Sequence, residues 1–149
     1  MKIFITNLGK YTEGYLIGKW VKLPVSEDKL NEVLEAIGIN EYYEEYFITD
    51  YENEIIGIGD VISEYSSVQA LNELAQRLEE LSDDEADKLG AVLEYEACRS
   101  VSDVLELLDK LDEFDLLTDV TDDEELGYYY AEEYRCIDIP EHIQPYFDY

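Results

Sequence analysis

Carboxylates are the side chains of this sequence that could do chemistry. The 149 residues include 38 Asp and Glu against 10 Lys and Arg, and the formal net charge is −28. Two carboxylates at a suitable separation can act as acid and base, as in glycoside hydrolysis. With 38 of them, close pairs arise in any fold, so the sequence does not single out a catalytic pair.

The spacing of the acids does not match a known metal or catalytic motif. The run Asp119–Glu125 lacks the glycine and the final glutamate of a calcium loop. The sequence has no HExxH or GxSxG motif, its two cysteines have no histidine nearby, and residues 57–60 (GIGD) are too short for a phosphate loop. We therefore expect no catalytic residue, no metal and no cofactor, in a protein that is not an enzyme.

The densest group of acids lies between Asp103 and Glu133. Thirteen of these residues are Asp or Glu, and one residue, Lys110, is basic. Leu, Val, Phe and Tyr are interspersed among the acids. This mixture indicates folded structure with a negative surface rather than a disordered tail.

The first part of this stretch predicts a helix with one acidic side. The helix begins at a weak capping box, Ser100–Asp103, and extends to about Leu111. Its apolar residues fall on one side: Val104, Leu105, Leu108 and Leu111. Acids spaced by three residues, about 4.5 Å of helix rise, fall on the other. We expect a row of four carboxylates: Asp103, Glu106, Asp109 and Asp112.

The acids that follow have two open interpretations. Residues 114–120 (FDLLTDV) predict a short strand, and the capping-box pattern Thr121–Glu124 predicts a helix to about Tyr134. Acids in the first turn stabilise a helix by about 0.3–1 kcal/mol each. Capping and partner binding therefore both remain open here. With the row above, these acids complete the candidate partner-binding carboxylates: Asp115, Asp119, Asp122, Asp123 and Glu125.

Tyrosine is also abundant, with 14 residues. Tyrosine packs its ring against apolar groups while its hydroxyl reaches water, and it is enriched at interfaces. Core-rim packing and a contact surface both remain open for these side chains. The candidate interface consists of three tyrosines and two acids: Tyr128, Tyr129, Tyr130, Glu132 and Glu133.

The net charge excludes some partners and favours others. It repels nucleic acid and acidic membranes, and it attracts basic surfaces such as DNA-binding clefts. Residues 1–30 carry +2 and residues 31–149 carry −30. By the charge density of duplex DNA, −28 corresponds to roughly 48 Å of duplex, or about 14 base pairs. The acid count therefore favours an elongated, DNA-like molecule.

The sequence predicts a cytoplasmic location. The start MKIFITNLGK has too short an apolar stretch for a signal peptide, and no apolar run approaches a membrane span. Cys98 and Cys136 lie far apart and are typical of reduced cysteines. We expect no membrane contact and no direct nucleic-acid partner.

The order of elements predicts an α+β protein. Strands are expected over residues 2–6, 15–23 and 46–49, a loop over 7–14, and a connector over 52–67. Helices are expected over residues 26–37, with Gly38 at the stop, and over 68–81 and 82–97. This order suggests an elongated chain of three small domains: α/β over 1–59, helical over 60–99, and α/β over 100–149.

Several motifs give the sequence a family resemblance. Residues 7–14 (NLGKYTEG) are followed by Leu16, Gly18, Trp20, Leu23 and Pro24, and residues 43–46 (YEEY) are followed by Ile48, Asp50, Tyr51 and Glu52. Weaker motifs are Leu71–Leu74, Tyr129-Tyr130 with Glu132-Glu133, and Pro140 with Tyr146–Tyr149. With these residues the sequence resembles the ArdA antirestriction family.

The resemblance implies a three-domain, elongated protein that imitates the shape and charge of bent B-DNA. Such proteins occupy the DNA groove of a type I restriction–modification enzyme, or of its methyltransferase core, and block it. They are typically carried by mobile genetic elements. The resemblance also implies a homodimer formed through the C-terminal domain.

The residues leave two alternatives to this function open. An inhibitor of another nucleic-acid enzyme, such as a CRISPR effector, would use the same charges. An acidic protein–protein adaptor would use its charge for solubility and residues 128–134 as its contact patch.

Overall fold

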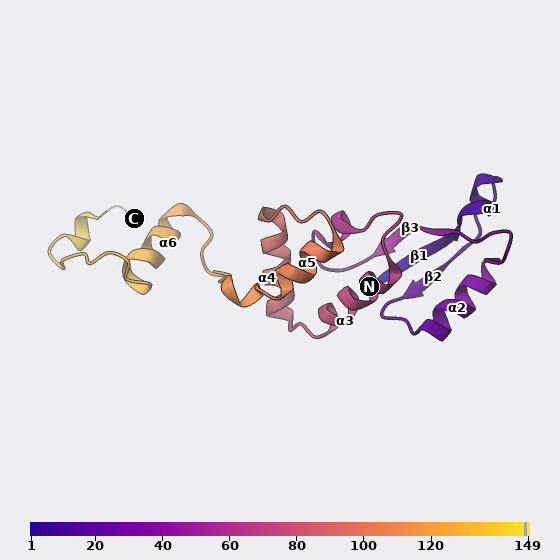
Figure 1. Cartoon of the computed structure of the whole chain (residues 1–149). Helices are drawn as coiled ribbons and strands as arrows, with labels where there is room; N and C mark the ends of the chain where they lie inside the picture. The colour runs from indigo at the N-terminus through magenta and orange to yellow at the C-terminus, as the bar shows by residue number, and fades with distance from the viewer. Residues whose placement is uncertain (148) are drawn as a thin grey trace. The chain divides into compact units, whose positions relative to one another are not determined.

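The computed structural model of the chain describes residues 1–147 and 149. The chain divides into unit 1, Met1–Phe114, and unit 2, Asp115–Tyr149. Figure 1 shows the helices and strands of both units. Asp148, which belongs to the last motif of the family resemblance, lies outside the described residues.

Unit 1 contains a three-stranded antiparallel sheet in the order β2-β1-β3 (Figure 1). The strands are β1 (Lys2–Asn7), β2 (Gly18–Lys22) and β3 (Tyr46–Glu52). Alternation along β1 buries Ile3 and Ile5 on one face, where they pair with Val21 and Ile48 respectively. The three predicted strands are confirmed, with β2 shorter and β3 longer than predicted.

The predicted loop over residues 7–14 is wrong, because it contains the short helix α1 (Leu8–Thr12). The Asn7 side chain accepts a hydrogen bond from the Lys10 backbone N–H at 2.9 Å and so caps the helix. Gly9 in this motif is typical of a loop, so the sequence did not indicate a helix capped by Asn7. By contrast, the expected helix after Ser26 is confirmed as α2 (Glu27–Ala36), with Ser26 as N-cap and Gly38 in the left-handed conformation after its end.

Serine N-caps begin the three helices of the helical part of unit 1, and those at Ser82 and Ser100 were predicted. Ser67, Ser82 and Ser100 are the N-cap residues of α3, α4 and α5. These helices span Val68–Glu79, Asp83–Tyr95 and Val101–Leu108. Two short 3₁₀ helices, η1 (Ile58–Val61) and η2 (Leu111–Glu113), precede α3 and follow α5.

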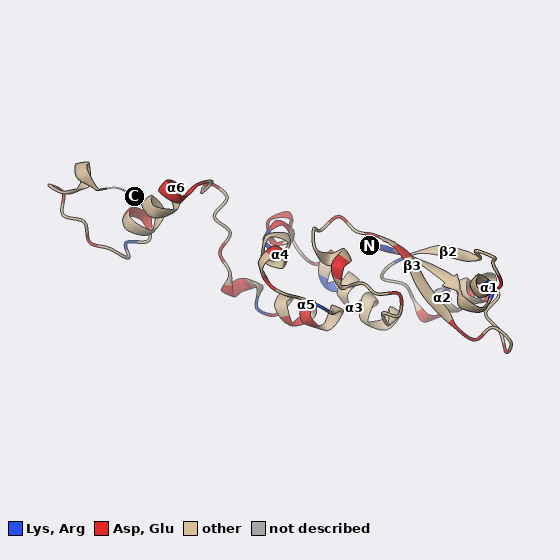
Figure 2. Cartoon of the chain, turned by 90° about the horizontal axis from the view of Figure 1, so that it is seen from above, with Lys and Arg blue, Asp and Glu red and all other residues tan. Residues whose placement is uncertain are grey.

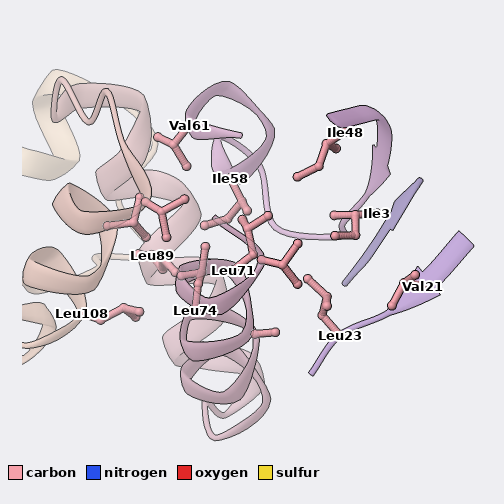
Figure 3. Packing of buried hydrophobic residues seen from close by; sticks show 14 of the residues in the cluster. Ile3, Val21, Leu23, Ile48, Ile58, Val61, Leu71, Leu74, Leu89 and Leu108 are labelled. Carbon is pink, nitrogen blue, oxygen red and sulfur yellow. The ribbon is translucent and has the colours of Figure 1, made fainter. Parts of the chain in front are cut away.

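One hydrophobic cluster joins the sheet to the helices of unit 1. In Figure 3, Leu71 and Leu74 of α3 lie between Ile3 and Leu23 on the sheet side and Leu89 on the helical side. Both leucines are fully buried. The α+β class is thus confirmed, whereas the three-domain division at residues 59/60 and 99/100 stays a prediction.

Unit 2 is built from short helical segments and extended chain. Helix α6 (Asp123–Tyr128) continues into a π-helical turn, η3 (Tyr129–Glu133), and η4 (Gln144–Tyr146) follows. The strand predicted over residues 114–120 is wrong: this segment is not helical or paired as a strand. A strand needs a ladder partner, and unit 2 offers none among its described residues. The predicted helix to Tyr134 is confirmed in extent, with a change of helix type.

Candidate partner-binding surface

The nine candidate carboxylates are all exposed. Figure 2 shows Asp and Glu in red along the helices and loops of the chain. Unit 1 holds Asp103, Glu106, Asp109 and Asp112, and unit 2 holds the other five. The structure therefore divides the candidate surface between two units, each of which has its own geometry.

Asp103 has a structural role at the start of α5. Its carboxylate accepts hydrogen bonds from the backbone N–H groups of Arg99 at 2.8 Å and Ser100 at 3.0 Å. In return, the Asp103 N–H donates to Ser100 Oγ at 3.3 Å, which completes a capping box. The bond from Arg99 N–H is the main cause that lowers the pKa of Asp103.

The predicted row of four acids on one helix is wrong, because α5 ends at Leu108. Asp109 is the C-cap residue and Asp112 lies in η2. The apolar spacing continues past this end, because Val104, Leu107, Leu108 and Leu111 are all buried at the spacing of one helix face, and it therefore predicted too long a helix. Asp109 also forms a salt bridge with Arg77 of α3 at 2.8 Å.

Two acids of unit 2 cap α6. Asp122 is the N-cap residue, and its side chain accepts from the Glu125 N–H at 2.9 Å. The Glu125 carboxylate accepts from the Thr121 N–H at 2.7 Å and from Thr121 Oγ1 at 2.8 Å. The predicted cap is thus present but one residue later, because Asp122 takes the role expected of Thr121.

The other five candidate carboxylates carry free charge. Within residues 1–147 and 149, they take part in no salt bridge or hydrogen bond: Glu106, Asp112, Asp115, Asp119 and Asp123. Acids with a cationic partner are few in the same part of the chain: Glu13, Glu32, Glu52 and Asp109. Most of the negative charge is therefore left for solvent or for a partner.

The tyrosines of the candidate interface pack against each other but stay accessible. The exposed fraction is 51% for Tyr128 and 47% for Tyr130, whereas Tyr129 is half-buried. The Tyr129 ring centroid lies 5.6 Å from that of Tyr130. Partial burial is the main cause that raises the pKa of Tyr129, and nearby Asp115 adds to it.

The Glu132 side chain forms a hydrogen bond within unit 2. It accepts a hydrogen bond from the Tyr149 hydroxyl at 2.8 Å, and this bond raises the pKa of Tyr149. The Tyr149 ring lies 5.3 Å from the Tyr128 ring, centroid to centroid. Glu132 and Tyr149 therefore hold the interface residues together rather than presenting charge.

A cavity of about 610 Å³ in unit 2 brings together residues that the sequence had placed in separate groups. Three candidate carboxylates line it, together with three residues of the candidate interface: Asp119, Asp122 and Glu125, and Tyr128, Tyr129 and Glu133. The segment of residues 116–120, which includes a turn, forms another wall. Sequence reasoning missed this wall because it had assigned the segment to a strand.

Sequence reasoning also missed a polar network in unit 1. The Tyr43 hydroxyl accepts from Lys10 Nζ at 2.6 Å and donates to Glu13 Oε1 at 2.8 Å. The contact with Tyr43 is the main cause that raises the pKa of Lys10 and lowers that of Glu13. This network attaches α1 to the segment before β3, so three residues of the two strongest motifs have a structural role.

Among the described residues, no group of three or more His, Cys, Asp or Glu side chains is arranged to hold a metal ion. Nor is any helix in residues 1–147 long and apolar enough to cross a membrane. The exposed acids and the cavity lined by acids and tyrosines are two candidate features for binding.

Comparison with protein families places the chain in a known family. A family model described as "Antirestriction protein (ArdA)" matches residues 3–149. No curated protein matches the chain. Since the family match spans nearly the whole sequence, the chain belongs to the ArdA family of antirestriction proteins.

Proposed function

We propose that this protein inhibits type I restriction–modification enzymes by occupying their DNA-binding groove as a DNA mimic, without catalysis. The family is one of antirestriction proteins, which implies restriction–modification enzymes as partners. The observation that carries the mimicry is the set of exposed carboxylates without a cationic partner: Glu106, Asp112, Asp115, Asp119 and Asp123.

The physical basis is the similarity of a carboxylate to a phosphate. A DNA-binding groove presents Lys and Arg side chains that pair with phosphate oxygens, and binding releases counterions from the DNA. Exposed carboxylates accept the same charge-assisted hydrogen bonds. A protein of net charge −28 also associates quickly with a basic cleft, because the long-range field steers the encounter.

The hydrogen bonds separate the candidate acids into two groups. Asp103, Asp122 and Glu125 use their carboxylates for helix caps, and Asp109 pairs with Arg77. These four have fewer free acceptors for a partner. We therefore assign phosphate imitation to the five acids that are free of such contacts, and structural roles to the other four.

We also propose that two copies pair through residues 100–149, as the resemblance implies. Unit 2 exposes apolar surface at Tyr130, Tyr134, Ile137 and Tyr146, which is compatible with a protein contact. Sedimentation measurements over a range of protein concentrations test this: a homodimer at micromolar concentration is expected, and a monomer at all concentrations contradicts it.

An inhibition assay tests the proposed function. A purified type I enzyme cleaves unmodified DNA that contains its site, with or without this protein. We expect inhibition at near-stoichiometric amounts, and relief when excess duplex is added before the protein, because both ligands need the same groove. Inhibition that duplex does not relieve contradicts a groove-binding mimic, and the absence of inhibition contradicts the proposal altogether.

A further inference from the structure

The cavity of unit 2, which is partly open to solvent, brings aromatic rings and carboxylates together. Tyr128 and Tyr129 line it together with Asp119 and Glu133, and Leu116 and Val120 add apolar wall. Its volume is about 610 Å³. Carboxylates alone do not define a binding site on so acidic a chain. The tyrosine rings that line this cavity beside the acids distinguish it from the rest of the acidic surface.

The charge inside the cavity is not balanced by unit 2 itself. Residues 115–149 contain eleven acids and one basic residue, Arg135, which does not line the cavity. Among the described residues, Asp119 and Glu133 form no hydrogen bond or salt bridge. The cavity therefore offers free anionic acceptors next to tyrosine faces, which is the composition of a cation-binding site.

We propose that this cavity receives the side chain of an arginine from the DNA-binding groove of the partner enzyme. A guanidinium group is planar, so it can stack on a tyrosine ring while it pairs with a carboxylate through two parallel hydrogen bonds. It is also more weakly hydrated than the ammonium group of lysine, which lowers the cost of entering the cavity.

The inference rests on the proposed function, since it names the residue type that the enzyme contributes at one place. It also differs from that function in a measurable way. Phosphate imitation by many dispersed acids depends on summed charge, so losing any single acid has a small effect. Binding of an arginine in a cavity depends on one carboxylate and one ring. The affinity lost on substitution therefore depends on where the substituted residue lies, and not only on the charge removed.

Titration with a small probe tests the cavity directly. The probe is N-acetyl-arginine amide, added to the full-length protein and followed by the NMR signals of the backbone amides and tyrosine rings. We expect saturable shifts centred on Tyr128, Tyr129 and Glu133. The neutral isostere N-acetyl-citrulline amide is expected to give none, and N-acetyl-lysine amide is expected to bind several-fold more weakly. Equal shifts from all three probes, or shifts spread over the acidic surface, overturn the proposal.

Matched variants test whether the cavity contributes to binding of the partner enzyme. Glu133→Gln and Glu141→Gln remove the same charge from exposed side chains of unit 2, but only Glu133 lines the cavity. Tyr129→Leu and Tyr95→Leu form a second pair, since Tyr95 is exposed and does not line the cavity. In displacement of duplex from a type I methyltransferase core, we expect about tenfold weaker displacement by the cavity variants. The control variants are expected to stay within about twofold of the unmodified protein.

The outcomes separate the two proposals. If the unmodified protein displaces duplex but Glu133→Gln and Glu141→Gln behave alike, the arginine cavity is wrong and mimicry stands. If the unmodified protein does not displace duplex at all, the proposed function fails, whatever the probe titration shows. Circular dichroism of each variant distinguishes a folding defect from a binding defect. If Tyr129→Leu fails to fold, the comparison of Glu133→Gln with Glu141→Gln still tests the cavity.

Discussion

At the scale of single residues, neighbouring acids of the same type have different roles. Asp103 and Glu106 both lie on α5 and are both exposed. Asp103 binds two backbone N–H groups at the start of the helix, whereas Glu106 contacts no cationic or hydrogen-bonding partner in the described part of the chain. Sequence position alone does not separate a capping acid from one that is free to bind a partner.

The capping role of Asp103 predicts a pH-dependent stability. Its pKa is lower in the folded state than in the unfolded state, because the folded chain donates hydrogen bonds to the carboxylate. The stabilisation is therefore present above the unfolded pKa and is lost as the pH falls through the folded pKa. We expect Asp103→Ala to lower the unfolding temperature by a few degrees at neutral pH, and by much less in acid.

Thermal unfolding followed by circular dichroism measures this effect, with Glu106→Ala as the control. Both substitutions remove one acid from α5, but only Asp103 completes the capping box. We expect Glu106→Ala to leave the unfolding temperature almost unchanged. Equal losses for both variants, or a loss for Asp103→Ala that does not depend on pH, contradict the assigned cap.

At the scale of elements, α3 joins the two layers of unit 1. Leu71 and Leu74 are fully buried between the sheet and the other helices. We expect Leu71→Ala to lower the free energy of unfolding by about 2–5 kcal/mol, because it removes apolar contacts and leaves a cavity. Chemical denaturation measures this change. Leu16→Ala is the control, since Leu16 is 67% exposed, and a comparable loss there contradicts the assigned core.

Local patterns predicted most of the elements of unit 1. Helices α2 to α5 begin after Ser26, Ser67, Ser82 and Ser100, and each of these side chains accepts a hydrogen bond in the first turn. Strand β1 follows from alternating apolar residues. These signals lie within a few residues of each other, so the sequence alone reveals them.

The errors arose where tertiary contacts decide the structure. Residues 114–120 have the composition of a strand, but a strand needs a neighbouring strand to pair with, and this segment pairs with none in residues 1–147. The apolar pattern does not mark the end of α5, because the buried Leu107, Leu108 and Leu111 keep helical spacing beyond it. The cavity of unit 2 depends on three segments coming together, and no local pattern predicts it.

At the scale of the whole molecule, the account predicts that the position of negative charge matters as well as its amount. One variant neutralises the five free candidate acids: Glu106→Gln, Asp112→Asn, Asp115→Asn, Asp119→Asn and Asp123→Asn. A matched variant neutralises five exposed acids elsewhere: Glu35→Gln, Glu41→Gln, Glu44→Gln, Glu64→Gln and Glu73→Gln. Both lower the net charge by the same amount.

We expect the first variant to lose at least about tenfold in inhibition of the type I enzyme, because each lost contact to a basic groove removes a share of the counterion-release term. The matched variant is expected to lose less, through reduced steering alone. Dose–response curves for the inhibition of DNA cleavage measure the difference. Equal losses for the two variants contradict the assignment of the binding surface to residues 103–125.

The central claim is that this protein and DNA compete for one groove, and direct displacement tests it. A fluorescent duplex bound to a type I methyltransferase core is titrated with the protein at several salt concentrations. We expect complete displacement of the duplex, and an affinity of the protein for the core that falls steeply as salt rises. A complex that holds duplex and protein together, or an affinity that does not change with salt, contradicts the account.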